Sequence, residues 1–413
     1  MQSPQLPLIP RALNFAGRQL ERVGLQPIRL DRDAILAGAR RATELDDFGD
    51  DSFREGLDRL LLSLDEDAQL SVLGRYIART DIGHCLENRL QLVDWHKRHP
   101  EIGRGEIRRP IFICGQGRTG TTILHELLAL DPANRVPLSW EVEFPFPPPE
   151  RDTYTTDPRI EACQKELDGS ERLVPDFKRM HRMGARLPQE CVRITASDFR
   201  SLIFTAQWRV IGYTQWLTHE ADMSSAYAFH KQMLQLLQWR CPAERWIVKS
   251  PGHLWCLEDV LGTYPDALFI QTHRDPLHVL SSLSSLEVVL RKMSSDRILL
   301  SEIAQEWSRW CSDSYDRSVD FRQKGMIDSS RIVDLQFRDF ISDPIRNVQS
   351  IYDQFGLELR PDVEKNMRDY VASNPSDRDG KHVHRIEDTG LDFAEERAKV
   401  KRYQEYFDVP SET

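Results

Sequence analysis

A glycine-rich turn stands between an apolar segment and a helical segment near residue 115. Ile111–Cys114 are continuously apolar, Gly115 and Gly120 follow, and residues 123–130 have the pattern of a helix that ends at Asp131 and Pro132. Such a turn offers several backbone N–H groups to one point, and the positive end of the helix dipole adds to them. The sequence therefore predicts an anion site here.

The same turn lacks the lysine of a nucleoside-triphosphate loop. Gly115 and Gly120 have the G-x-x-x-x-G spacing, but Thr121 stands where that loop continues with Lys. The cation in the turn is Arg118, which lies between the two glycines. The pattern favours an anionic ligand and argues against an ATPase or kinase.

A second group of polar residues follows another apolar segment at Arg274. Asp275 is placed to cap a helix that has Pro276 at its first position, and Ser282 lies about two turns into that helix. A guanidinium and a hydroxyl near the carboxyl end of a strand could both bind the same phosphate group. His273-Arg274-Asp275 also matches the start of a protein-kinase catalytic loop, but Leu280 stands where that loop needs Asn.

These two stretches resemble the sulfotransferases that use 3′-phosphoadenosine 5′-phosphosulfate (PAPS). The segment 117–122 is similar to their 5′-phosphosulfate loop, and Arg274 with Ser282 resembles their 3′-phosphate motif. The resemblance covers about residues 109–390 and is closest to a bacterial branch with a helical N-terminal region. It implies donor binding by Gly115, Gly117, Arg118, Thr119, Gly120, Thr121, Thr122, Arg274 and Ser282.

The resemblance also implies a cationic catalytic group and a base. Lys249 ends the apolar segment 246–249, and a family lysine at this place contacts the bridging oxygen; Arg118 would assist it. For the proton of the acceptor hydroxyl there are two candidates, and we favour Glu141 slightly over His253. Glu141 is similar in placement to the glutamate base of the protein-tyrosine sulfotransferases, whereas His253 lies four residues after Lys249 and its family counterpart lies two after. Alternatively, Glu141 pairs with Arg118 and His253 caps a helix.

Four further features concern the donor, a metal ion and the acceptor. The basic loop 378–385 includes Lys381 and His382, and a family loop here closes over the 3′-phosphate, although a solvated charge run is the alternative. His382 and His384 lack an apparent third metal ligand, so we expect no metal. Ile123 stands where cytosolic enzymes have an adenine-stacking Trp, and Glu190 is a candidate for the acceptor side.

The elements that must position these residues alternate along the chain. Buried strands are predicted at 111–114, 246–249, 267–270 and 332–335, with helical patterns between them. This order predicts an α/β fold, a P-loop-like three-layer core around a parallel sheet. We expect an N-terminal helical region at 1–105 and a sulfotransferase domain at 106–413, with a helical, aromatic-rich insertion at about 150–240 on the acceptor side.

Composition limits the remaining possibilities. The 413 residues carry a net charge of −10, which disfavours nucleic acid as a partner. Seven cysteines without a C-x-x-C predict buried, reduced thiols. No run of about 18 apolar residues occurs, and residues 1–17 lack the apolar core of a signal peptide. We therefore expect a cytoplasmic protein without a transmembrane segment, and a possible homodimer.

The function predicted from these features is sulfuryl transfer from PAPS to a hydroxyl of a small-molecule acceptor (an alcohol, phenol, sterol or lipid). A P-loop-type nucleotide kinase and a non-catalytic nucleotide-binding protein are the alternatives. The sequence does not identify the acceptor.

Overall fold

The computed structural model describes residues 6–175, 182–374 and 385–412. Its described strands form one parallel sheet in the order β2-β3-β1-β4-β5. The strands are β1 (Ile111–Cys114), β2 (Asn134–Arg135), β3 (Arg245–Lys249), β4 (Leu268–His273) and β5 (Ile332–Gln336). The four predicted strands are confirmed, while β2 was not predicted and β4 runs three residues beyond the predicted end.

Helices cover both faces of the sheet, as the alternation of strands and helices predicted. Before β3 they are α1 (Leu8–Arg22), α2 (Arg32–Thr43), α3 (Phe53–Glu66), α4 (Val72–Arg98), α5 (Thr121–Leu128), α6 (Ser139–Glu143), α7 (Pro158–Leu173), α9 (Cys191–Thr195), α10 (Leu202–Gln207), α11 (Ile211–His219) and α12 (Ser224–Gln238). After β3 they are α13 (Leu257–Thr263), α14 (Pro276–Arg291), α15 (Leu300–Gln323), α16 (Phe337–Ser342), α17 (Pro344–Phe355), α18 (Pro361–Ser373) and α19 (Phe393–Phe407). Short 3₁₀ turns are η1 (Ile102–Arg104), η2 (Arg151–Thr153), η3 (Ala196–Asp198), η4 (Pro251–Trp255), η5 (Ser329–Arg331) and η6 (Ile386–Thr389).

Alternate residues of β1 pack into different cores. Ile111 and Ile113 face α5, α17 and α18 on one side, whereas Phe112 and Cys114 face α12, α13, α15 and α19 on the other. This period of two follows from the pleat of a strand. Burial on both faces explains why the strand is apolar throughout, and it gives the three layers of an α/β fold.

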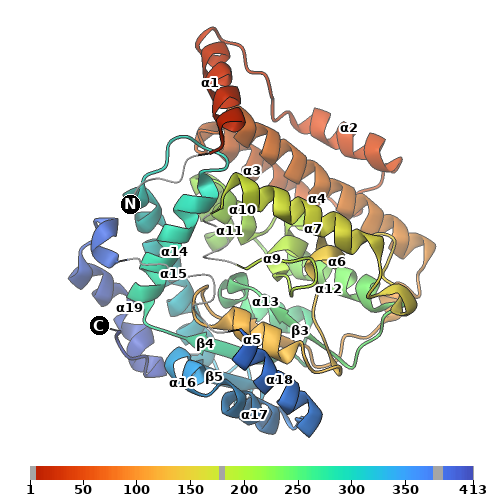
Figure 1. The fold of residues 1–413 in the computed structure, drawn as a ribbon, viewed down its shortest axis with the longest axis vertical. Helices are drawn as coiled ribbons and strands as arrows, with labels where there is room; N and C mark the ends of the chain where they lie inside the picture. Colours follow the sequence, from red (N-terminus) through yellow and green to blue (C-terminus); the bar gives the residue numbers. More distant parts are fainter. Residues whose placement is uncertain (1–5, 176–181, 375–384, 413) are drawn as a thin grey trace.

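A further core joins the N-terminal helices to the insertion. Side chains of α2, α3 and α4, among them Leu57 and Leu86, pack with Phe204 of α10 and with Tyr213 and Trp216 of α11. An ion pair between Arg89 and Asp198, both buried, crosses the same contact with an N···O distance of 2.9 Å. Helices α2, α3 and α4 therefore share one core with α10 and α11, and α3 and α4 lie beside these two helices in Figure 1.

The cysteines agree with the prediction, since all seven are unbridged and buried. Among the described helices, none is both long and apolar enough to cross a membrane.

Candidate active site

The glycine-rich turn lies between β1 and α5, at the carboxyl edge of the sheet. Gly115 has φ of 139° and Gly120 has φ of 87°, conformations that favour glycine. A side chain at Gly115 would place its Cβ 2.2 Å from Oγ1 of Thr272 on β4. The first glycine thus allows the turn to lie directly against the neighbouring strand.

The threonines of the turn divide into two kinds. Thr119 is buried, and its hydroxyl donates to the Gln116 carbonyl at 2.7 Å and lies 2.6 Å from the Thr272 hydroxyl. Thr121 is buried at the first turn of α5, whereas Thr122 is exposed. Thr119 consequently holds the shape of the turn, and Thr122 presents its side chain to solvent.

The structure brings the turn and the Arg274 motif together. Arg118 Nε donates to the Ser282 hydroxyl at 3.1 Å, and Arg274 Nη1 donates to the Arg118 carbonyl at 3.0 Å. Burial, together with the nearby Arg274 charge, lowers the pKa of Arg118. Two guanidinium groups beside a helix N-terminus form a cationic site in an acidic protein, which fits a ligand with several negative charges.

The predicted helix start at Asp275 is confirmed. The Asp275 carboxylate accepts from the Leu277 N–H at 3.0 Å and caps α14, with Pro276 at the first helical position. Arg274 directly precedes this cap, so the cap fixes its position beside the start of the helix. The guanidinium of Arg274 stacks on Phe337, with 3.9 Å between its Cζ and the ring centroid.

Phe337 was missed in the sequence. It is the first residue of α16, directly after β5. The rule that ligands bind at the carboxyl ends of parallel strands, applied to β5 as it was to β4, would have indicated it.

Lys249 lies at the same edge of the sheet, as predicted. It ends β3 beside Ile113 of β1 and is almost fully buried. Its ammonium group forms an ion pair with Glu190, the residue before α9, which is partly exposed. The insertion at about 150–240 therefore contributes the carboxylate that pairs with Lys249, the lysine predicted to act in catalysis.

Glu141 has different surroundings from those considered in the sequence. Its buried carboxylate pairs with Arg135 and not with Arg118. It also accepts from the Tyr154 hydroxyl at 2.9 Å and from the Leu138 N–H at 3.1 Å, which closes the N-terminus of α6. Both carboxylate oxygens are thus engaged and shielded from solvent.

His253 is buried in η4, beside a cavity. Its Nδ1 lies 2.8 Å from the Tyr227 hydroxyl, its ring meets Phe112 edge-on, and its Nε2 has no hydrogen-bond partner among the described residues. Burial, followed by the charges of His230 and Lys249, holds the pKa of His253 well below its usual value. His253 is therefore a neutral imidazole near neutral pH.

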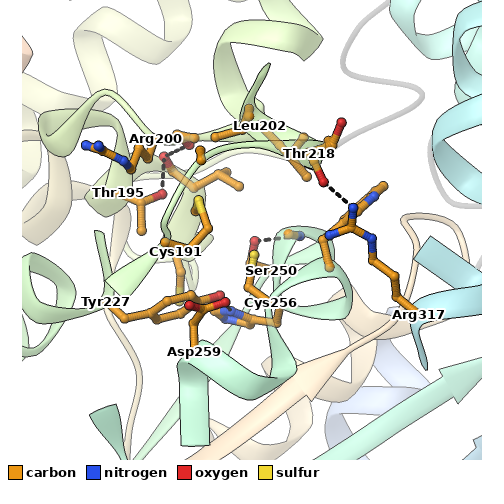
Figure 2. Close-up of a pocket in the computed structure, with 18 of the residues that line it drawn as sticks. Cys191, Thr195, Arg200, Leu202, Thr218, Tyr227, Ser250, Cys256, Asp259 and Arg317 are labelled. Atoms are coloured by element: carbon orange, nitrogen blue, oxygen red, sulfur yellow. Dashed lines mark hydrogen bonds between the residues drawn. The ribbon is translucent and has the colours of Figure 1, made fainter. Parts of the chain in front are cut away.

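The cavity beside His253 has a volume of about 100 Å³. Figure 2 shows the side chains that surround it. They are Cys191 and Thr195 of α9, Tyr227 of α12, Arg317 of α15, and Ser250, which directly follows β3. Its wall is completed by apolar residues, namely Val192, Leu202, Leu217, Met223 and Trp255. Because Cys191 and Ser250 directly follow Glu190 and Lys249 in the chain, the cavity adjoins that ion pair.

Two predicted donor-binding residues, Lys381 and His382, lie outside the described residues. Among the described residues, no three or more His, Cys, Asp or Glu side chains are grouped so as to hold a metal ion.

Comparison with known proteins gives a consistent result. A profile described as "Sulfotransferase family" matches residues 110–361. The crystal structure of sulfotransferase STF1 from Mycobacterium tuberculosis H37Rv is 31% identical, with a TM-score of 0.80 over 89% of this chain and 98% of that chain. Sulfotransferase STF9 from Mycobacterium avium is 29% identical, with a TM-score of 0.84 over 92% of this chain and 97% of its own.

A curated relative is less similar in sequence. The omega-hydroxy-beta-dihydromenaquinone-9 sulfotransferase Stf3 of Mycobacterium bovis is 26% identical over 277 residues, which are 64% of this chain and 67% of Stf3.

Proposed function

This chain belongs to the sulfotransferase family and is an enzyme of sulfuryl transfer, and from that premise we propose how its own residues use PAPS. The observation that supports the proposal most strongly is the contact of Arg118 with Ser282 and of Arg274 with the Arg118 carbonyl. These contacts join two motifs, one proposed for each charged end of the donor.

In this proposal the turn after β1 binds the 5′-phosphosulfate. Gly115, Gly117 and Gly120 let the backbone approach it, and Thr121 and Thr122 hold it at the start of α5. Arg118 lies between this end of the donor and the 3′-phosphate, which Arg274 and Ser282 bind. Thr119 acts through the shape of the turn. Lys381 and His382 remain proposed contacts of the 3′-phosphate.

Lys249 stabilises the leaving oxygen. As the bond between sulfur and the bridging oxygen breaks, negative charge grows on the 5′-phosphate, and a buried ammonium group at the strand end offsets it. The new bond forms between sulfur and the acceptor oxygen, whose proton passes to a base. The products are a sulfate ester and adenosine 3′,5′-bisphosphate.

For the base we propose Glu190 in place of Glu141. Glu190 touches Lys249 and is partly exposed, so it can meet an acceptor hydroxyl, whereas the Glu141 carboxylate is occupied by Arg135, Tyr154 and Leu138. His253 is the alternative, because it lines the cavity and its Nε2 has no hydrogen-bond partner in the part of the chain that the structure describes.

We propose the cavity as part of the acceptor site. Its apolar wall suits the carbon skeleton of a small-molecule alcohol or phenol. We also propose that the chain divides into two regions at about residue 105 and that it forms a homodimer.

Two measurements test the proposal. Titration calorimetry with adenosine 3′,5′-bisphosphate and with ATP should give about 10–100-fold tighter binding of the bisphosphate, the value of one or two charge-assisted phosphate contacts. Sulfate transfer from labelled PAPS should then be followed over alcohols, phenols, sterols and an ω-hydroxylated menaquinone, the kind of acceptor in the name of Stf3. Tight ATP binding without preference for a 3′-phosphate would favour a kinase, and inactivity towards all acceptors would favour a binding protein.

A further inference from the structure

The segment after α19 folds back onto the start of α14. The chain turns at Asp408, where φ is 52°, and Val409 is buried in the core that α19 shares with α12, α13 and α15. The Gln404 amide donates to the Val409 carbonyl at 3.0 Å. The Glu412 N–H then donates to the Asp275 carboxylate at 2.7 Å. Residues 408–412 are thereby held against the cap of the helix that follows Arg274.

The Asp275 cap is itself fixed by α19. Arg397 of α19 makes two hydrogen bonds to the Asp275 carboxylate, of 2.6 and 3.0 Å. The same side chain donates to the Gln404 side chain at 2.8 Å. The place where the segment arrives is therefore a built contact.

Glu412 brings its carboxylate directly to Arg274. Arg274 Nε and Nη2 donate to the two Glu412 oxygens at 2.7 and 2.9 Å, in the paired geometry that a guanidinium makes with carboxylate or phosphate. His278 Nδ1 lies 3.4 Å from the same carboxylate. Although burial alone would raise the pKa of Glu412, the hydrogen bonds and charge of Arg274, with the charge of His278, outweigh it and lower that pKa.

This contact occupies the edge of Arg274 that a phosphate would need. The guanidinium has two outward groups, Nε and Nη2, and both are taken by Glu412, while Nη1 is held by the Arg118 carbonyl. Phe337 covers one face of the guanidinium. A 3′-phosphate can make the paired contact with Arg274 only after the Glu412 carboxylate leaves it.

We propose that Glu412 is an intramolecular anion that occupies the 3′-phosphate position of the donor site and is exchanged for the donor. This inference rests on the proposed role of Arg274. The competing contact lowers the apparent affinity for every nucleotide that carries a 3′-phosphate, because a fraction of the sites is closed by the chain itself. A nucleotide without that phosphate leaves the Arg274–Glu412 pair intact.

The difference between two nucleotides gives the test. Glu412→Gln and Glu412→Ala would be titrated with adenosine 3′,5′-bisphosphate and with adenosine 5′-monophosphate. The matched control is Glu405→Gln, which changes an exposed α19 carboxylate paired with Lys401. The Glu412 variants should bind the bisphosphate about 3–30-fold more tightly, as expected for a partly exposed paired contact, with the monophosphate affinity unchanged.

Several outcomes would overturn the exchange. Weaker bisphosphate binding by both Glu412 variants would make the segment a clamp on the donor instead of a competitor. Equal tightening of both nucleotides, or no change in either, would show that Glu412 does not occupy the phosphate position. If the wild-type chain does not prefer the bisphosphate over the monophosphate, the proposed role of Arg274 fails and the exchange fails with it; a preserved preference with no effect of Glu412 refutes the exchange alone.

Discussion

Replacing Gly115 by Ala should distort the turn that we propose for donor binding. The added Cβ would lie 2.2 Å from the Thr272 hydroxyl and 2.9 Å from the Thr272 carbonyl oxygen. The hydroxyl cannot withdraw without loss, because it also bonds to Thr119 and to the Cys114 carbonyl. We therefore expect the turn to move away from β4.

The cost has two parts. A backbone with φ of 139° is rarely adopted by residues with a side chain, which costs about 1–3 kcal/mol. Overpacking against Thr272 adds about 1–3 kcal/mol. The sum of about 2–6 kcal/mol is a large part of the typical 5–15 kcal/mol of unfolding free energy. The variant should fold with reduced stability and bind adenosine 3′,5′-bisphosphate at least about tenfold more weakly, since backbone N–H groups of the turn leave their positions.

Urea unfolding followed by circular dichroism and calorimetric titration would measure the two effects. Gly262→Ala is the control, because Gly262 lies on α13 with no atom near its added Cβ; this change should stabilise the chain by about 0.5–1 kcal/mol. A Gly115→Ala/Thr272→Ala double variant lacks the Thr272 hydroxyl that the added Cβ would meet. Its loss of unfolding free energy should therefore be smaller than the sum of the losses of the two single variants. If the Gly115→Ala variant has an unfolding free energy within about 0.5 kcal/mol of wild type and an unchanged affinity for the bisphosphate, the reasoning is refuted.

Three further predictions concern charged groups. Lys249→Met should lower PAPS turnover by about 10²–10³ through lost stabilisation of the leaving oxygen, with bisphosphate affinity, measured by calorimetry, much less affected; an equal loss of affinity would make Lys249 a binding residue. Glu190→Gln should lower kcat by about 10²–10⁴, whereas Glu141→Gln should mainly lower the unfolding free energy measured in urea. The opposite result would return the role of base to Glu141, and a loss specific to His253→Asn would assign it to the imidazole. Burial raises the pKa of Glu287 to about 8 from 4.5, so the folded chain keeps a proton that the unfolded chain loses, and stability falls as pH rises between these values; Glu287→Gln should remove this slope in urea unfolding from pH 5 to 8, and an unchanged slope would contradict it.

The sheet and its ligand edge could be predicted because their signals are local. The apolar segments at β1, β3 and β4 are buried on both faces, so each shows a continuous pattern in the sequence, whereas β5, at the edge of the sheet, is partly exposed and is interrupted by Asp334. The carboxyl ends of parallel strands share one edge, so the turn at Gly115, Lys249 and Arg274 could be expected to lie close together before any contact was known. The two-residue strand β2 was missed because such a short element has no periodic pattern.

The partners of the candidate bases could not be predicted in the same way. The contact of Glu190 with Lys249 depends on how the insertion folds over β3, across 59 positions of sequence. Glu412 reaches Arg274 across 138 positions. The pairing of Glu141 with Arg135 likewise arises from the unpredicted β2 and from the capping of α6.

The cavity in Figure 2 lies between two hydrophobic cores of the protein. Leu217 belongs to the core shared with the N-terminal helices, whereas Tyr227 and Trp255 belong to a core of the sheet. Substitutions among the N-terminal helices can therefore reshape one wall of the cavity while the strands that carry the Gly115 turn keep their packing. With the cavity proposed as part of the acceptor site, descendants of such a chain can acquire new acceptors through changes far from the reacting atoms, while the proposed donor site keeps its packing.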